Sequence, residues 1–102
     1  MFIISITVNS DVSEQQQSEL FPRHVEWLQR YFSAGHFLLM GPYSDTKAHA
    51  GVILAQMDSR EALQSALEED CYYPGLATYA IREFTPTGMA ADISSAMTSE
   101  DL

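Results

Sequence analysis

The sequence predicts a single α+β domain in which two helices and four strands follow each other in the order βαββαβ. Three observations carry this prediction: apolar residues alternate in the outermost segments, two helix-start signals lie between strands, and two apolar strands adjoin in the middle. With 102 residues, 46% of them apolar and 19% charged, the chain has the composition of one globular domain. We expect an antiparallel sheet with both helices on one face, the ferredoxin-like arrangement of this element order.

The first strand and the first helix are predicted from local pattern alone. Residues 2–8 alternate apolar side chains in the way of a half-buried strand. Ser13 and Gln16 have the spacing of a capping box, so a helix is expected to begin there and to run to about Ser33. Pro22 lies inside this helix and either kinks it or separates its first turn from the rest.

A hairpin of two apolar strands is predicted in the middle of the chain. Residues 36–43 and 49–57 are the two strands, with a polar turn between them. Gly41 and Pro42 interrupt the first strand, as a bulge or a strand break.

The second helix is expected from Ser59 to about Asp70, with Asp58 as its N-cap. The last strand is expected at residues 76–86, which completes a folded domain of residues 1–86. From residue 87 to 102 the chain is small, polar and acidic without a period, so we expect a flexible acidic C-terminal tail.

The charge balance excludes several classes of partner. Five Lys and Arg against fourteen Asp and Glu give a net charge of −9, which opposes binding to nucleic acid and to anionic membranes. An RNA-binding βαββαβ domain is further opposed by the lack of a basic, aromatic strand signature. The start of the chain lacks the basic region of a signal peptide, and no apolar run approaches the ~20 residues of a membrane span. We therefore expect a soluble cytoplasmic protein.

The open face of the predicted sheet suggests a homodimer. Ile3, Ser5 and Thr7 share the face opposite to the helices, together with apolar residues of the hairpin. Two helices cannot cover both faces, so a second copy of the chain is the economical cover.

A histidine and an aspartate both fall on inward-facing helix positions. At about 100° per residue from Leu20, His24 lies at about 40°, within the apolar stripe of the first helix. On the second helix, Asp70 falls within the apolar arc and Glu69 on its edge. A His–Asp pair that faces the sheet suits general acid–base chemistry. The same pattern also fits a structural histidine with one satisfied hydrogen bond, and both interpretations stay open.

Other candidate site residues carry weaker patterns. A glycine-proline break lets a ligand approach the backbone, so Gly41 and Pro42 are candidate substrate-binding residues, as is Tyr72, whose pattern also fits packing. His36 and His49 open the two hairpin strands, but a metal site with His24 lacks ligand spacing, and none is predicted. The single cysteine, Cys71, has no base near it in sequence and is expected to be structural.

Several segments in order resemble the YciI-like (YCII-related) family. They are MFIISITV at the start, HVEWL from His24, AGHFLLMGP ending at Pro42, AGVILA ending at Ala55, and GLATYAIREFTP from Gly75 to Pro86. The resemblance spans about residues 1–86. It implies the dimeric α/β-barrel version of the ferredoxin-like fold and a proposed active site with a His–Asp pair.

The family histidine carries over to His24. The family aspartate usually opens an Asp-Pro-Phe segment six residues before the Gly-Leu that is Gly75 here. Asp70 lies five residues before Gly75 and Glu69 lies six, so either carboxylate corresponds to it. The helix positions favour Asp70.

The resemblance also implies proton-transfer chemistry, because some relatives act in the catabolism of hydroxylated or chlorinated aromatics and related barrels include muconolactone isomerases. We expect a small cofactor-free lyase or isomerase that acts on a small cyclic or aromatic compound. His24 would be the general acid or base, and Asp70 would orient it. The alternative is a non-catalytic dimeric module that binds a small molecule or another protein.

Overall fold

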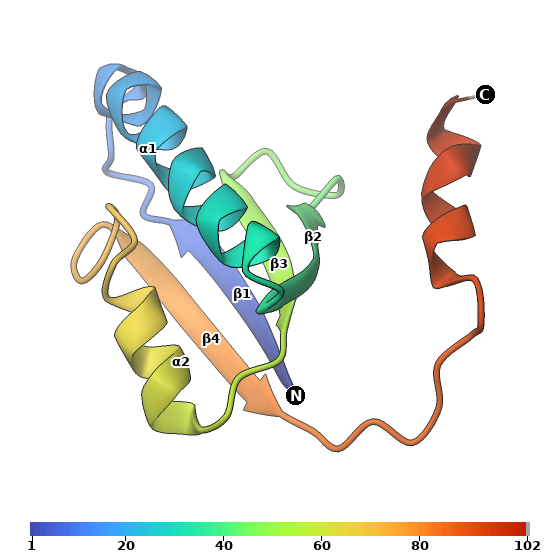
Figure 1. Ribbon diagram of the computed structural model, residues 1–102. Coiled ribbons are helices and arrows are strands. Elements are labelled where there is room, and N and C mark those ends of the chain that lie inside the picture. Colours follow the sequence, from blue (N-terminus) through green and yellow to red (C-terminus); the bar gives the residue numbers. More distant parts are fainter. Residues whose placement is uncertain (102) are drawn as a thin grey trace.

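The computed structural model describes the backbone of residues 1–101 and the side chains of residues 1–97. Its first six elements follow the predicted order, and a 3₁₀ helix follows them near the C-terminus (Figure 1). The elements are β1 (Phe2–Val8), α1 (Glu14–Ser33), β2 (Phe37–Pro42), β3 (Ala50–Ala55), α2 (Arg60–Leu67), β4 (Ala77–Glu83) and η1 (Ile93–Asp101). The four strands form one sheet in the order β2-β3-β1-β4, with every neighbouring pair antiparallel. The predicted fold class is therefore confirmed.

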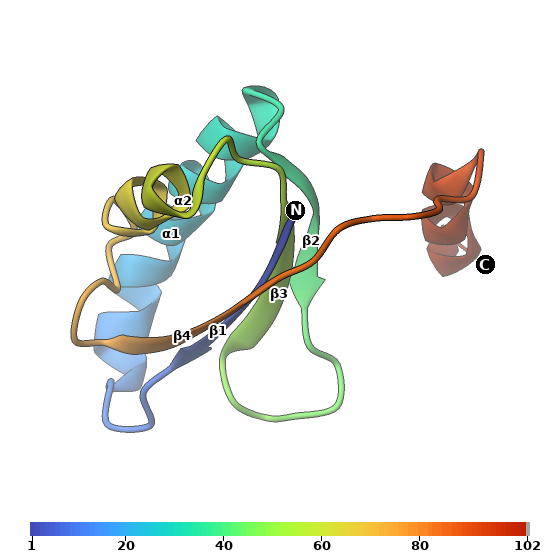
Figure 2. The same cartoon turned by 90° about the horizontal axis from the view of Figure 1, so that it is seen from below.

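The core lies between the sheet and the two helices. Both helices lie on the same side of the curved sheet, which is clear when Figure 2 is compared with Figure 1. The buried side chains come from the inner face of the strands and from the facing sides of both helices; the largest are Trp27, Tyr72, Phe2, Phe37, Ile4, Leu63 and Leu67. The Trp27 Nε1–H donates to the Ala66 carbonyl oxygen at 2.9 Å, which ties α1 to the last turn of α2.

Helix α1 begins and ends at the predicted residues. The Ser13 hydroxyl accepts from the Gln16 backbone N–H at 3.1 Å, and the Gln16 side chain accepts from the Ser13 backbone N–H. The helix runs without a break through Pro22. It stops before Gly35, whose φ of +85° is the left-handed conformation that glycine adopts without strain.

The irregularity in β2 lies earlier than the sequence suggested. Its register shifts between Phe37 and Leu39, whereas Gly41 and Pro42 continue the ladder against Val52 and Gly51. Pro42 is tolerated because β2 is an edge strand, where a missing N–H interrupts no second ladder.

Strand β3 requires a glycine at position 51, where it faces β2. A Cβ placed at Gly51 would lie 2.9 Å from the Gly41 carbonyl oxygen, so the two strands approach too closely for a side chain there.

Helix α2 differs from the prediction at both ends. Its N-cap is Ser59 and not Asp58, because the Ser59 hydroxyl accepts from the Ala62 N–H at 3.0 Å. The helix ends at Leu67, so Asp70 lies in the turn that follows and not on the helix.

The second face of the sheet carries apolar side chains that no element within the described residues covers. Ile3 is 40% exposed and Leu39 is 45% exposed on this face, beside Val52 and Leu54. The C-terminal segment leads away from the sheet in both views, and η1 lies apart from the domain (Figures 1 and 2). The expected flexibility of residues 87–102 stays a prediction, and Leu102 lies outside the described residues.

No helix in the described part of the chain is long and apolar enough to cross a membrane.

Candidate active site

His24 and Asp70 form a direct pair between α1 and the turn after α2. His24 Nδ1 lies 2.8 Å from Asp70 Oδ1. The Asp70 side chain is fully buried, while the His24 side chain keeps 13% of its surface exposed. The carboxylate thus lies behind the ring, and the ring lies between the carboxylate and solvent.

The turn after α2 delivers the Asp70 carboxylate to this position. The Asp70 N–H donates to the Leu67 carbonyl at 3.1 Å, and the Asp70 carbonyl accepts from the Tyr73 N–H at 3.0 Å. The second carboxylate oxygen accepts from the Tyr79 hydroxyl at 2.7 Å. Burial, together with the hydrogen bond to Asp70, raises the pKa of the Tyr79 hydroxyl, so this group stays a proton donor to the carboxylate.

Glu69, the other candidate carboxylate, points elsewhere. Its Oε1 lies 2.8 Å from Arg30 Nη2 in an ion pair with both side chains about half exposed. The structure therefore brings Asp70, and not Glu69, to His24.

The hydrogen bond at Nδ1 determines which nitrogen of the ring is available. A carboxylate can only accept, so the neutral ring donates its Nδ1–H to Asp70 and carries a lone pair on Nε2. Within the described residues, Nε2 has no hydrogen-bond partner. An orienting carboxylate behind Nδ1 and a free Nε2 in front is the arrangement by which a histidine serves as a general base.

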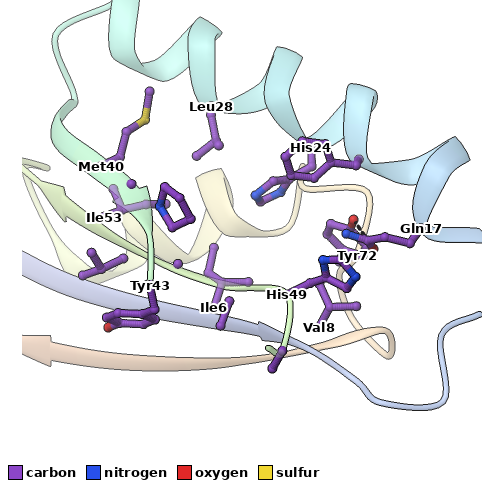
Figure 3. A pocket seen from close by; sticks show the side chains of 17 residues that line it. Ile6, Val8, Gln17, His24, Leu28, Met40, Tyr43, His49, Ile53 and Tyr72 are labelled. Atoms are coloured by element: carbon purple, nitrogen blue, oxygen red, sulfur yellow. Dashed lines mark hydrogen bonds between the residues drawn. The ribbon is translucent and has the colours of Figure 1, made fainter. Parts of the chain in front are cut away.

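His24 faces a cavity between α1 and the β2–β3 side of the sheet (Figure 3). The cavity has a volume of about 410 Å³. Its lining includes three predicted substrate-binding residues, Gly41, Pro42 and Tyr72, while Asp70 lies behind His24 and outside the lining. The rest of the wall is largely apolar and includes Ile6, Val8, Phe21, Leu28, Met40 and Ile53.

The His24 ring is held by aromatic neighbours as well as by Asp70. Its centroid lies 5.2 Å from that of Tyr72 and 5.5 Å from that of Trp27. These contacts restrict the orientation of the ring, but its exposed edge stays in the cavity wall. The geometry is thus compatible with chemistry and not only with a structural role.

Two further polar groups, neither of them predicted as a site residue from the sequence, belong to this site. Tyr79 holds Asp70, and Gln17 accepts a hydrogen bond from the Tyr72 hydroxyl at 2.7 Å. Gln17 could have been found, because the helical spacing that placed His24 inward puts it at about 60°, in the same apolar stripe. Tyr79 alternates with Ala77 and Ile81 toward the core, and a buried tyrosine hydroxyl needs a partner.

The other histidines do not join His24. His36 Nδ1 lies 3.4 Å from the Gln56 carbonyl, outside the cavity lining. His49 lines the cavity, and its Nε2 lies 3.5 Å from the Glu14 carboxylate. Among the residues with described side chains, no three His, Cys, Asp or Glu come together as a set that could hold a metal ion.

Cys71 lies beside the pair without taking part in it. Its Sγ–H donates to the Leu20 carbonyl at 3.3 Å. Burial, with the charge of Asp70, raises the pKa of the thiol, which makes it a poor nucleophile.

Two solved structures share this fold at low sequence identity. The 5-chloro-2-hydroxyhydroquinone dehydrochlorinase of Burkholderia phenoliruptrix AC1100, in complex with 2,5-dihydroxybenzoquinone, is 15% identical with a TM-score of 0.65, covering 83% of this chain and 94% of its own. A muconolactone isomerase is 19% identical with a TM-score of 0.67, covering 89% of this chain and 96% of its own. Both have the dimeric α/β-barrel fold, and at these identities the likeness concerns the fold alone.

No curated protein matches the sequence at a significant level. The YCII-related domain, in contrast, matches residues 1–85, which is the whole of the sheet and both helices. The chain therefore belongs to the YCII-related family.

Proposed function

We propose that this protein is a small lyase or isomerase that uses His24 and Asp70 to transfer a proton on a small cyclic or aromatic compound. The observation that carries the proposal is a histidine backed by a fully buried carboxylate at 2.8 Å and exposed to a cavity of about 410 Å³. A cavity of this size suits one small ring, and its largely apolar wall suits the hydrocarbon part of that ring.

The roles of the residues follow from the hydrogen bonds. His24 Nε2 takes a proton from a carbon or oxygen of the substrate, while Asp70 holds Nδ1–H and offsets the positive charge that develops on the ring. Tyr79 keeps the carboxylate in place. In an isomerisation, the His24 imidazolium returns the proton to another carbon of the substrate. In an elimination, a leaving group departs from the substrate carbon next to the one that lost the proton.

The two structural neighbours support this reaction class without assigning it. One is named a dehydrochlorinase, which eliminates HCl, and the other a muconolactone isomerase. Both names describe reactions that begin at a small oxygenated ring, so their substrates are the first to test on this protein. We propose catalysis without a bound cofactor and, for the whole protein, a cytoplasmic location.

Deuterium exchange in D₂O tests the proposal before the full reaction is known. 5-Chloro-2-hydroxyhydroquinone and muconolactone are incubated with the protein, and deuterium uptake at carbon, chloride release and isomer formation are followed by NMR. We expect uptake or turnover with the natural sequence and its loss in His24→Asn. His36→Asn is the matched control, because His36 lies outside the cavity. Binding without exchange on either compound would favour the non-catalytic ligand-binding module instead.

We also propose that the protein is a homodimer that buries the open face of the sheet. Ile3 and Leu39 expose 40% and 45% of their surface there, beside Val52 and Leu54, and a contiguous exposed apolar patch is typical of a protein–protein contact surface. Light scattering is expected to give about twice the 11.4 kDa of one chain. Ile3→Glu is expected to yield a folded monomer, whereas Phe32→Glu, an exposed apolar position on α1, is the control and stays dimeric. A monomer in the natural protein at micromolar concentration would refute this.

A further inference from the structure

We infer that the side-chain amide of Gln17 binds an oxygen atom of the ligand at the end of the cavity away from His24, and that Tyr72 positions this amide. The inference rests on the proposed function, because it assigns the second polar contact of the same cavity.

Gln17 is a buried amide with one end unused. It is 6% exposed and lies in the cavity lining, beside Tyr72 in Figure 3. Its Oε1 accepts from the Tyr72 hydroxyl at 2.7 Å, but in the described part of the chain no group accepts from its Nε2. Among the described residues, every fully buried side-chain nitrogen has a hydrogen-bond partner. Because Nε2 of Gln17 has none among these residues, it keeps some accessible surface. The Nε2 N–H groups therefore lack a partner among the described residues, and because Gln17 lines the cavity, a ligand oxygen can accept from them.

Tyr72 determines which end of the amide faces the ligand. A phenol has one proton to donate, and this proton is used on Gln17 Oε1. Burial raises the pKa of Tyr72 to about 12, so the hydroxyl stays protonated and remains the donor. The amide oxygen is thereby held at Tyr72, and the nitrogen is left for the ligand. Tyr72 itself presents its ring to the cavity and acts on a ligand oxygen through Gln17.

The spacing of Gln17 and His24 indicates the kind of ligand. They lie seven residues apart on α1, which is two helical turns and a rise of about 10 Å on the same face. This rise separates the two backbone positions, and both side chains line the same cavity of about 410 Å³, a size that suits a ligand of one six-membered ring with an oxygen substituent. The lining contains neither Lys nor Arg among the described residues, which favours an uncharged oxygen over a carboxylate. The ligand class is a six-membered ring whose carbonyl or hydroxyl oxygen lies across the ring from the atom that meets His24.

Two ring probes of nearly equal shape test the amide directly. Cyclohexanone carries an acceptor oxygen where methylenecyclohexane carries a CH₂ group. Their affinities are measured by NMR titration, and the ratio of the two affinities is compared between variants, which cancels differences in packing. Gln17→Glu keeps an acceptor for Tyr72 and removes both N–H donors, while Gln17→Met removes every polar atom. Gln29→Glu is the matched control, because Gln29 is exposed on the same helix.

The affinity for cyclohexanone divided by that for methylenecyclohexane is expected to fall about three- to tenfold in both Gln17 variants. A change of this size corresponds to the loss of one hydrogen bond. It is expected to stay unchanged in Gln29→Glu and to fall by a smaller factor in Tyr72→Phe, which frees the amide without removing it. The Gln17 side-chain NH₂ signals of the natural protein are expected to shift with cyclohexanone and not with methylenecyclohexane. This signal keeps the test valid if a Gln17 variant does not fold.

An unchanged ratio in the folded Gln17 variants, or NH₂ signals that respond equally to both probes, would overturn the inference. Absence of binding of both rings to the natural protein would overturn it as well. His24→Asn separates the two proposals, because it is expected to remove deuterium exchange and leave the ratio intact. If the natural protein keeps the ratio but catalyses no exchange, the proposed reaction fails and the assignment of Gln17 stands.

Discussion

Replacing Asp70 by asparagine tests the centre of the proposed mechanism, because it changes charge at almost constant size. Asp70 accepts two short hydrogen bonds, from His24 at 2.8 Å and from Tyr79 at 2.7 Å. An amide has one acceptor oxygen, so it cannot accept from both neighbours with separate oxygens. If the amide nitrogen faces His24, the ring must move its proton to Nε2 and loses the lone pair that acts as the base. If it faces Tyr79, the tautomer survives but the carboxylate charge is gone.

The expected loss of stability is modest. A hydrogen bond to a charged group contributes about 1.5–3 kcal/mol and a neutral one about 0.5–1.5 kcal/mol, so two bonds lose roughly 2 kcal/mol together. Removing a fully buried charge offsets part of this loss. We expect the free energy of unfolding to fall by about 1–2 kcal/mol, which leaves most domains folded. The rate of proton transfer is expected to fall by up to about 10⁴, the loss that follows when the carboxylate that orients a catalytic histidine becomes an amide.

Glu69→Gln is the matched control for this substitution. It removes a carboxylate one residue away whose ion pair with Arg30 is about half exposed on both sides. Such pairs contribute about 0–1 kcal/mol, and no change in rate is expected. Urea denaturation gives the stabilities, and deuterium exchange into the two test compounds gives the rates. Equal rates for Asp70→Asn and the natural protein would refute the pair as the catalytic unit, and an equal loss in Glu69→Gln would refute the assignment to Asp70.

Three further predictions concern His24, Tyr72 and the C-terminal segment. His24→Asn is expected to remove exchange while lowering the free energy of unfolding by less than about 1.5 kcal/mol, and a loss of 2 kcal/mol or more would indicate a structural histidine. The pKa of Tyr72 is raised to about 12 from its ordinary 10.0, so its contribution to stability is complete below pH 10 and is lost as the pH rises to about 12. Alkaline denaturation curves are expected to show this decline, on the order of 2–3 kcal/mol from Tyr72, and in Tyr72→Phe the decline is expected to be smaller by this amount, because the raised pKa of the Tyr79 hydroxyl still contributes to it. Ending the chain after Thr87 is expected to change stability and oligomeric state little, because η1 lies apart from the sheet; a loss of several kcal/mol, or of dimerisation, would show that the segment packs against a partner.

The Asp70 side chain faces α1, as helix periodicity predicted, although Asp70 itself lies beyond the end of α2. The helical spacing placed Asp70 inward on the assumption that the helix reached it, but α2 ends at Leu67. The turn after the helix is closed by backbone hydrogen bonds from Glu69 N–H to the Ala66 carbonyl and from Asp70 N–H to the Leu67 carbonyl, and the Asp70 side chain still reaches His24 on α1. Local backbone hydrogen bonds thus preserved a direction that helix periodicity had suggested.

The helices and strands of this fold could be predicted from the sequence because they depend on local interactions. Alternation in β1, the capping box of Ser13 and Gln16, and the apolar stripe of α1 depend on neighbours within a few residues. The register that joins β1 to both β3 and β4, the hydrogen bond from Tyr79 to Asp70, and the cavity between α1 and the hairpin depend on residues tens of positions apart. Which inward polar groups meet one another was therefore decided only by tertiary packing, because a periodic pattern states the face on which a side chain lies and not the partner that lies opposite it.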